Sequence, residues 1–295
     1  RFSASRRLCP SEPMHGAMAV ARQEEGLGYN FVTIPLLLVT IFVFCVRSLT
    51  SDAAPGAAVE PDVELRASTA LAVLHIGVAT GAVALLRVVY LDANYLVVNY
   101  RVFGRSDTPE VEMKFRHLGR WTTFTLWCNT VGMLYFVLAA LLDISLLVNG
   151  RAPKMLAMAK SALWEVTFPT AFLVNLVVTL VLLPACKKAG KLDKLEILLR
   201  FRPQCLHNGF VLVAAVEAAL ASPPMRPGNF PAIALYGMAY VIFALGLWMR
   251  TGIVHYFFLD PRFRFSTLAM VVLFTLLAVL HRLGCIAVAS ASTSP

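Results

Sequence analysis

The stretch RWTTFTLWCNTVGMLYFVLAALLDISLLV, at residues 120–148, decides the fold of this chain. After Arg120, its single charged residue is Asp143. The stretch is longer than the roughly 20 mainly apolar residues that cross a bilayer as a helix. A helix satisfies its own backbone hydrogen bonds in hydrocarbon, whereas a lone strand does not. The stretch therefore predicts a transmembrane helix.

The rest of the chain has the same character. Hydrophobic residues make up 58% of it, the mean hydropathy is +0.71, and only 15% of residues are charged, against roughly 25% in a soluble domain. We predict an all-α integral membrane protein, a bundle of about seven transmembrane helices. The six further spans are expected at 31–49, 67–91, 161–184, 206–222, 230–258 and 267–289.

The spans form one predicted transmembrane domain over residues 31–290, between a tail or targeting remnant at 1–30 and a C-terminal tail at 291–295. Lysines and arginines concentrate in the N-terminal tail and in alternate loops, around 101–120, 187–202 and 262–264. By the positive-inside rule the N-terminus is cytoplasmic and the C-terminus lies on the other side. These basic loops lack interleaved aromatic residues, so the net charge of +9 does not indicate nucleic-acid binding.

The chain starts at Arg1, so we expect a processed or truncated N-terminus. The opening RFSASRRL resembles an organellar transit peptide, but Glu12, Glu24 and Glu25 favour an ordinary cytosolic tail. The endoplasmic reticulum or plasma membrane is therefore expected, with an organellar membrane as the alternative. A helical pattern in KLDKLEILLRF, at 191–201, predicts a loop helix that lies on the membrane surface or in solvent.

The six cysteines form no CxxC pair and have no metal-type spacing to histidine. We therefore expect no metal, no cofactor and no disulfide framework. The chain also lacks GxSxG, HExxH, P-loop and GxGxxG motifs. The sequence motifs therefore do not support a conventional hydrolase, protease, kinase or dehydrogenase.

Polar residues inside the spans are costly in lipid and point to cavities or ion pairs. We expect them in two layers. The layer at the far end from the basic loops should form ion pairs. Glu217 lies roughly 15 Å along its helix from His207. It should pair with a cation such as Arg282 or accept a hydrogen bond while protonated. The basic-side layer is Arg87, Thr123, Asn129, Asn175, His207, Asn208, Arg250, His255 and Tyr256; the other layer is His75, Asp143, Glu165, Glu217, His281 and Arg282.

Thr123 and His207 fall in the first turns of two spans that start on the same side. A neutral imidazole can take the proton of a threonine hydroxyl and make it a nucleophile. The positive end of a helix dipole keeps such a histidine neutral, and unpaired amides at helix starts can stabilise an oxyanion. The arrangement suits acyl transfer. Taken singly, a helix-bonded threonine and an interfacial histidine remain the simpler interpretations.

Four stretches carry a resemblance: WTTF at 121–124, Phe168-Pro169, HNGFVLVAAVE at 207–217, and YVIFALGLWMRTGIVHYFFLD at 240–260. Over about residues 115–262 the chain resembles the androgen-induced family of multi-pass membrane proteins. Its departures from that family are Phe257 in place of a proline, a missing second histidine near the base, and an extra span before the shared region.

The resemblance implies a threonine hydrolase that cleaves fatty acid esters of hydroxy fatty acids. Thr123 would be the nucleophile and His207 the base, and lipid substrate would reach them sideways from the bilayer. The expected substrate-binding residues are Asn208, Arg250, Tyr256 and Asn175, and the expected structural polar residues are Glu217, Tyr240 and Asp260.

Two other functions stay open. The extra span and the departures from the family are compatible with a non-catalytic membrane subunit or scaffold whose protein partners are unknown. Buried charges are also compatible with a transporter, although no internal repeat is seen. A more distant likeness, to the rolling-stone group of membrane proteins, does not account for the spacing from His207 to Glu217.

Overall fold

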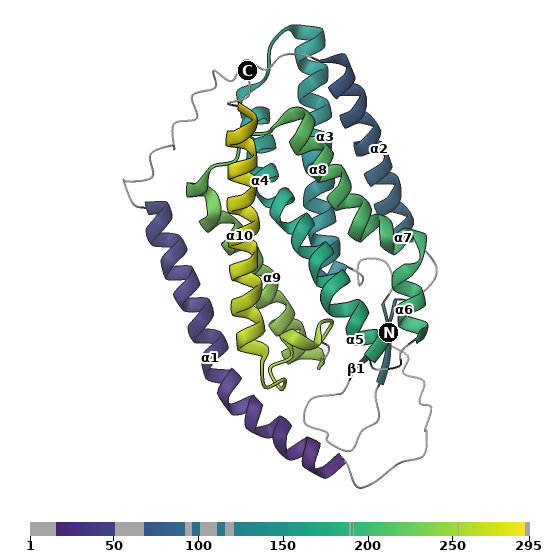
Figure 1. The fold of residues 1–295 in the computed structure, drawn as a ribbon, viewed down its shortest axis with the longest axis vertical. Helices are drawn as coiled ribbons and strands as arrows, with labels where there is room; N and C mark the ends of the chain where they lie inside the picture. Colours follow the sequence, from purple (N-terminus) through teal and green to yellow (C-terminus); the bar gives the residue numbers. More distant parts are fainter. Residues whose placement is uncertain are drawn as a thin grey trace.

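The computed structural model describes residues 16–50, 68–91, 96–100, 111–115, 121–188, 190, 192–252 and 254–292. Long helices run side by side along the longest axis of the molecule (Figure 1). Within the described residues six helices are long and apolar enough to cross a membrane, and Val32–Ser48 is a shorter apolar segment. The prediction of an all-α multi-pass membrane bundle is confirmed.

The long helices follow the predicted spans. The first begins at Gly16, inside the stretch expected as a tail. The long helices are α1 (Gly16–Thr50), α2 (Thr69–Leu91), α3 (Phe124–Asn149), α4 (Lys154–Leu176), α8 (Phe210–Ala221), α9 (Phe230–Thr251) and α10 (Ser266–Ser292).

Shorter elements complete the chain. The strands β1 and β2 pair as an antiparallel hairpin between α2 and α3, outside the spans. The short elements are β1 (Leu96–Tyr100), β2 (Val111–Phe115), η2 (Val177–Leu182), α5 (Leu183–Lys188), α6 (Leu192–Leu199), α7 (Phe201–Gln204), η3 (Cys205–Gly209), η4 (Pro227–Asn229) and η5 (Phe257–Leu259). The helix predicted in the loop after α5 is therefore present as α6, and its relation to the membrane surface stays a prediction.

Glycines set two helix ends. Gly150 and Gly252 have φ of 62° and 72°, and their N–H groups donate to Leu146 O and Trp248 O. Because a left-handed residue cannot continue a right-handed helix, both helices stop there. The predicted span 230–258 was therefore wrong at its end, since α9 stops at Thr251.

Two π-helical segments interrupt regular α-helix. The first, η2, lies between α4 and α5, so that one continuous span covers Lys154–Lys188. The second, η3, carries His207 into the start of α8. Single π turns widen a helix locally and are frequent at functional sites.

Helix α4 lies at the centre of the packing, where it contacts α3, α8, α9 and α10. In Figure 1, α2 lies beside α3, and α1 runs along the flank of α9 and α10. An aromatic cluster of Tyr135, Phe136, Trp164 and Phe168 fills the centre between α3 and α4.

The first helix is held to the bundle by polar contacts. Asn30 is fully buried, and its Nδ2 donates to Pro261 O at 2.8 Å and Phe263 O at 2.9 Å. The hydroxyl of Thr267 donates to Asn30 Oδ1 at 2.7 Å, and Thr33 contacts Thr267 through a second 2.7 Å hydrogen bond. In an apolar surrounding such bonds resist separation, because unpaired groups would be costly.

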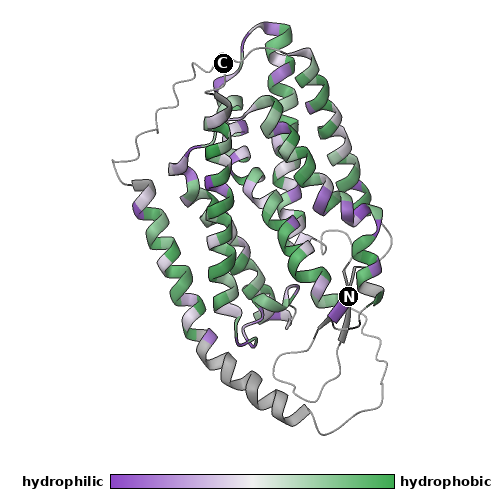
Figure 2. Ribbon diagram, in the orientation of Figure 1, coloured by the Kyte–Doolittle hydropathy of each residue, from purple (hydrophilic) through white to green (hydrophobic). Residues whose placement is uncertain are grey.

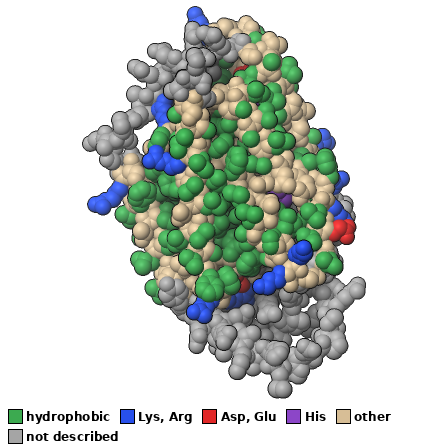
Figure 3. All heavy atoms as spheres, in the orientation of Figure 1, with side chains coloured by type: hydrophobic (Ala, Val, Ile, Leu, Met, Phe, Trp, Pro, Cys, Tyr) green, Lys and Arg blue, Asp and Glu red, His purple; other side chains and the backbone are tan. Residues whose placement is uncertain are grey.

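The outside of the bundle is apolar. Hydrophobic colouring predominates along the described parts of the long helices in Figure 2. In the space-filling view of Figure 3, apolar side chains cover the middle, and most lysines and arginines lie toward the margins. Large side chains such as Leu36, Leu141 and Ile242 are 63%, 49% and 53% exposed, which in a membrane places them against lipid.

A close contact between α3 and α8 depends on Gly132. A Cβ atom built there would lie 2.0 Å from the Phe210 ring, whereas one at Gly77 meets nothing within 4 Å. We expect Gly132→Ala to lower the free energy of unfolding by about 1–3 kcal/mol through overpacking. Thermal unfolding in detergent would measure this, with Gly77→Ala as the matched control; equal behaviour of the two variants would contradict the contact.

The loop after α9 contains a half-buried histidine, His255, that lines a small cavity with Tyr240, Trp248 and Leu259. Burial lowers the pKa of His255 from an ordinary value near 6.5 to about 4. Because the folded protein then resists protonation more than the unfolded chain, His255 lowers stability as the pH falls from about 6.5 toward 4, by up to about 1.4 kcal/mol per pH unit. We expect His255→Phe to flatten the acid side of the stability profile measured by thermal unfolding. A variant with the same acid slope as the wild type would contradict this.

Candidate functional site

Thr123 lies at the start of α3. It is the N-cap residue, with φ of −92° and ψ of 142°, and its side chain makes no capping hydrogen bond. Its carbonyl accepts the N–H of Trp127 at 3.3 Å. The neighbouring carbonyl of Thr122 accepts the Tyr240 hydroxyl at 3.1 Å. The start of α3 is thereby fastened to α9.

His207 lies in η3 and is only 8% exposed. Its Nδ1 atom has no hydrogen-bond partner within the described part of the chain. Buried polar atoms are usually paired, and one that is not calls for an explanation. A nitrogen held in this way is available to a substrate, a water molecule or another side chain that approaches it.

Asn129 brings the start of α3 against η3. Its Nδ2 donates to Thr125 O at 2.8 Å on its own helix and to Leu206 O at 3.1 Å on η3. Leu206, the residue before His207, therefore lies beside Asn129 at the same depth in the bundle. Helical side chains lean toward the N-terminus of their helix, so the imidazole of His207 leans toward the side of the membrane on which α3 begins.

The contact between Asn129 and Leu206 also shows which threonine lies on the side of α3 that faces η3. Thr123 precedes Asn129 by six residues, about 9 Å along the axis and about 120° around it. Thr125 precedes Asn129 by four residues and so lies on the same helix face, one turn earlier. Thr125 is also buried, at 8% exposure. The pairing of Thr123 with His207 stays a prediction, and Thr125 is a second candidate that the sequence reading missed.

The expected substrate-binding residues fall into two places. Asn175 on α4 and Asn208 on η3 meet: Asn175 Nδ2 donates to Asn208 Oδ1, and Asn208 Nδ2 donates to Gln204 Oε1. The structure therefore brings Asn175 and Asn208 together, and Asn208 directly follows His207 in the sequence. Arg250 is exposed near the end of α9, so its side chain is apart from the buried groups of the site.

Tyr256 packs inside the loop after α9, with its ring edge-on to Tyr240 at a centroid distance of 6.3 Å. Burial raises the pKa of Tyr256. Asp260 accepts hydrogen bonds from Arg262 N at 2.9 Å and Arg262 Nε at 2.8 Å. Asp260 thus holds its own turn between η5 and α10.

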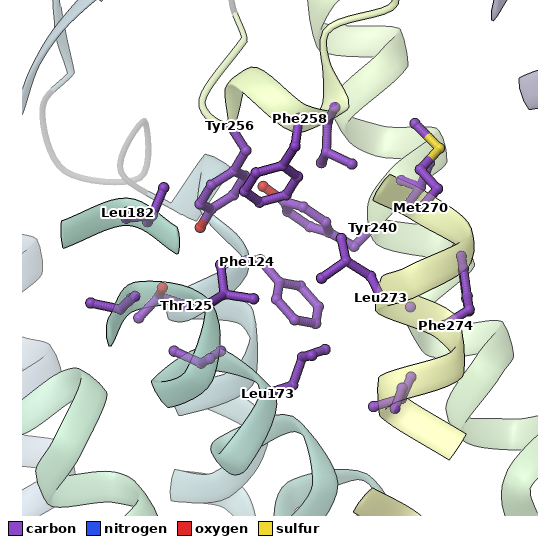
Figure 4. A pocket seen from close by; sticks show the side chains of 17 residues that line it. Phe124, Thr125, Leu173, Leu182, Tyr240, Tyr256, Phe258, Met270, Leu273 and Phe274 are labelled. Carbon is purple, nitrogen blue, oxygen red and sulfur yellow. The ribbon is translucent and has the colours of Figure 1, made fainter. Parts of the chain in front are cut away.

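A cavity of about 70 Å³ lies beside the first turn of α3, between α4, η2, α9 and α10. Figure 4 shows Tyr256 and Tyr240 at one end and Leu173, Leu273 and Phe274 lower in the same cavity. Among its lining residues, only Thr125, Tyr240 and Tyr256 carry a hydroxyl group. The cavity is thus apolar, with a hydroxyl cluster at one end.

A second cavity, of about 240 Å³, lies on the neighbouring face of α3. Its walls come from α2, α3 and the segment around His207, where Leu206 and Gly209 line it. Asn129 and Phe136 line it from α3. The two cavities flank the part of α3 that contacts η3, although the lining of neither includes Thr123 or His207.

The second predicted polar layer consists of buried acid and histidine pairs. Glu217 is fully buried and contacts His75 and Tyr135, whereas Arg282 is exposed. The partner of Glu217 is therefore His75 rather than a cation such as Arg282, which the sequence suggested. On the other side of α4, His281 Nε2 lies 2.9 Å from Glu165 Oε2.

No grouping of three or more histidine, cysteine or acidic side chains that would suit a metal ion occurs among the described residues. Comparisons of the chain with protein-family models, curated proteins and solved structures gave no match. The resemblance to the androgen-induced family therefore stays an expectation carried by the four quoted stretches.

Proposed function

We propose that this protein is an intramembrane hydrolase of fatty acid esters of hydroxy fatty acids or similar lipid esters. A threonine in the first turn of α3 is the nucleophile, and His207 is the base. The observation that carries the proposal is the hydrogen bond from Asn129 to Leu206 O, at 3.1 Å. It fixes the hydroxyl-bearing start of α3 against the segment that holds a buried histidine with an unpartnered Nδ1.

The two candidate nucleophiles have different support. Thr123 has the family-like sequence context and a side chain that makes no capping bond. Thr125 lies on the face of α3 that carries Asn129 and lines the smaller cavity together with Tyr256. The geometry favours Thr125, and the sequence resemblance favours Thr123.

The chemistry balances with the groups present. The imidazole of His207 accepts the threonine proton as the hydroxyl oxygen bonds to the ester carbonyl carbon. The alcohol leaves with that proton, which gives an acyl-threonine. His207 then deprotonates the attacking water and passes this proton to the threonine oxygen as the fatty acid is released. Unpaired N–H groups in the first turn of α3 are suited to stabilise each oxyanion.

The two cavities suit a substrate with an apolar chain on each side of its ester bond. Their walls are largely apolar, and they flank the α3 segment that contacts η3. Pockets of this kind orient a ligand through a few polar groups among many apolar ones. Tyr256 and the pair Asn175 and Asn208 are the polar groups proposed to hold the ester.

A non-catalytic subunit or scaffold is the second candidate. It is favoured by one observation, that neither cavity lining includes Thr123 or His207. A protein of this kind would co-purify in a defined complex and would turn over no lipid ester.

The test uses purified protein in nanodiscs, with labelling by a serine/threonine hydrolase probe and hydrolysis of a fatty acid ester of a hydroxy fatty acid. We expect His207→Ala to lower the rate by roughly 10²–10⁴-fold. Either Thr123→Ala or Thr125→Ala should abolish both labelling and turnover, which identifies the nucleophile.

The matched control is Thr130→Ala, because Thr130 lies on the same helix and bonds back to Leu126 O at 2.7 Å. It should keep wild-type turnover. Wild-type activity in both Thr123→Ala and Thr125→Ala, or in His207→Ala, would refute the proposal. An inactive wild type that co-purifies in a complex would favour the scaffold.

A further inference from the structure

Four buried side chains form a continuous hydrogen-bonded chain in the half of the bundle away from the basic loops. His75 on α2 lies between two carboxylates: its Nδ1 is 2.5 Å from Asp143 Oδ2, and its Nε2 is 2.8 Å from Glu217 Oε2. The hydroxyl of Tyr135 donates to the other Glu217 oxygen at 2.5 Å. The chain, which we call the His75 relay, joins α2, α3 and α8.

The number of protons in its hydrogen bonds sets the net charge of the His75 relay. Each contact between an imidazole nitrogen and a carboxylate oxygen needs one hydrogen between the two atoms. Two such hydrogens on one imidazole and two carboxylates leave a net charge of −1, wherever each hydrogen sits within its bond. Tyr135 supplies its own hydrogen and does not alter this sum.

A net charge at this place is costly. His75, Tyr135 and Glu217 are all 0% exposed, and the surrounding cluster is apolar, with Phe136 and Trp164 among its members. An uncompensated buried charge in a membrane protein attracts either a counter-ion or a proton.

The described elements packed against the His75 relay offer few other charges. Lys160 on α4 lies with its Nζ 5.8 Å from the centroid of the Tyr135 ring. Glu165 on α4 faces His281 on α10 instead, and Cys285 packs in the same apolar cluster. Among the described side chains, Asp143 is paired with His75 and with no lysine or arginine.

One atom of the His75 relay is left to take a proton. Both nitrogens of His75 and both oxygens of Glu217 are engaged, whereas no hydrogen bond to Asp143 Oδ1 is found in the described part of the chain. The Asp143 side chain is also the exposed end of the chain, at 9% against 0% for its partners. Asp143 lies about two turns before the end of α3 at Asn149, on the side away from the basic loops.

We propose that the His75 relay is an intramembrane proton-binding site that takes up one exchangeable proton at Asp143 from the face opposite the basic loops. With the proton bound, the relay is neutral and holds α2 against α3 and α8. Without it, the net negative charge weakens this packing. The site is independent of the proposed ester hydrolysis, since it involves neither His207 nor the threonines of α3.

The test is infrared difference spectroscopy of the full chain in nanodiscs, titrated between about pH 4 and 9 in H₂O and D₂O. We expect a protonated-carboxyl stretching band that shifts in D₂O, disappears as the pH rises, and is absent in Asp143→Asn. Glu165→Gln and Asp260→Asn, which remove carboxylates elsewhere, should keep the band.

A second variant keeps the test decisive if Asp143→Asn does not fold. Asp143→Glu should retain a titrating band with a shifted midpoint, because the carboxyl remains but its distance to His75 changes. A band that is unchanged across this pH range, absent from the wild type, or preserved in folded Asp143→Asn would overturn the proposal.

Discussion

The constraint on which the rest of this structure depends is that hydrocarbon offers polar groups no hydrogen-bond partners. Backbone groups meet it by forming helices, and the described strands β1 and β2 pair in a hairpin outside the spans. Side chains meet it by pairing across helices, as Asn30 does with the turn before α10 and as His75 does with two carboxylates. Polar contacts between helices therefore specify which helices are neighbours, because apolar contacts with lipid and with protein are nearly equivalent.

The two polar layers differ in what surrounds their unpaired groups. In the layer away from the basic loops, Glu217 and Glu165 have partners on both carboxylate oxygens, and the buried Nδ1 of His281 has none in the described residues. In the layer near the basic loops, His207 also keeps a buried nitrogen without a partner in the described residues, and it sits in a π-helical turn whose Leu206 and Gly209 line the larger apolar cavity. Paired groups favour a structural role, whereas an unpaired group is suited to take up a proton or to react.

The sequence predicted the fold well because hydropathy reports directly on which segments can lie in lipid. The predicted span 230–258 was wrong at its end, because the left-handed conformation of Gly252 ends α9 well before the apolar run stops. Partners of buried charges were also missed: depth along a helix can be counted from the sequence, but the neighbouring helix cannot, so Glu217 was assigned to Arg282 and not to His75. The i, i+4 spacing of Thr125 and Asn129 was the available signal for a second candidate nucleophile, and it becomes informative only once η3 is known to contact Asn129.

The attachment of α1 has a consequence for how the protein is made. Asn30 bonds to carbonyls 231 and 233 positions later in the chain, so these partners leave the ribosome long after α1 does. Until then the amide of Asn30 must remain in the bilayer or at its border without its final partners. The seating of α1 is therefore expected to follow the synthesis of the turn before α10, and a nascent chain interrupted before that turn would present an unsatisfied amide to membrane quality control.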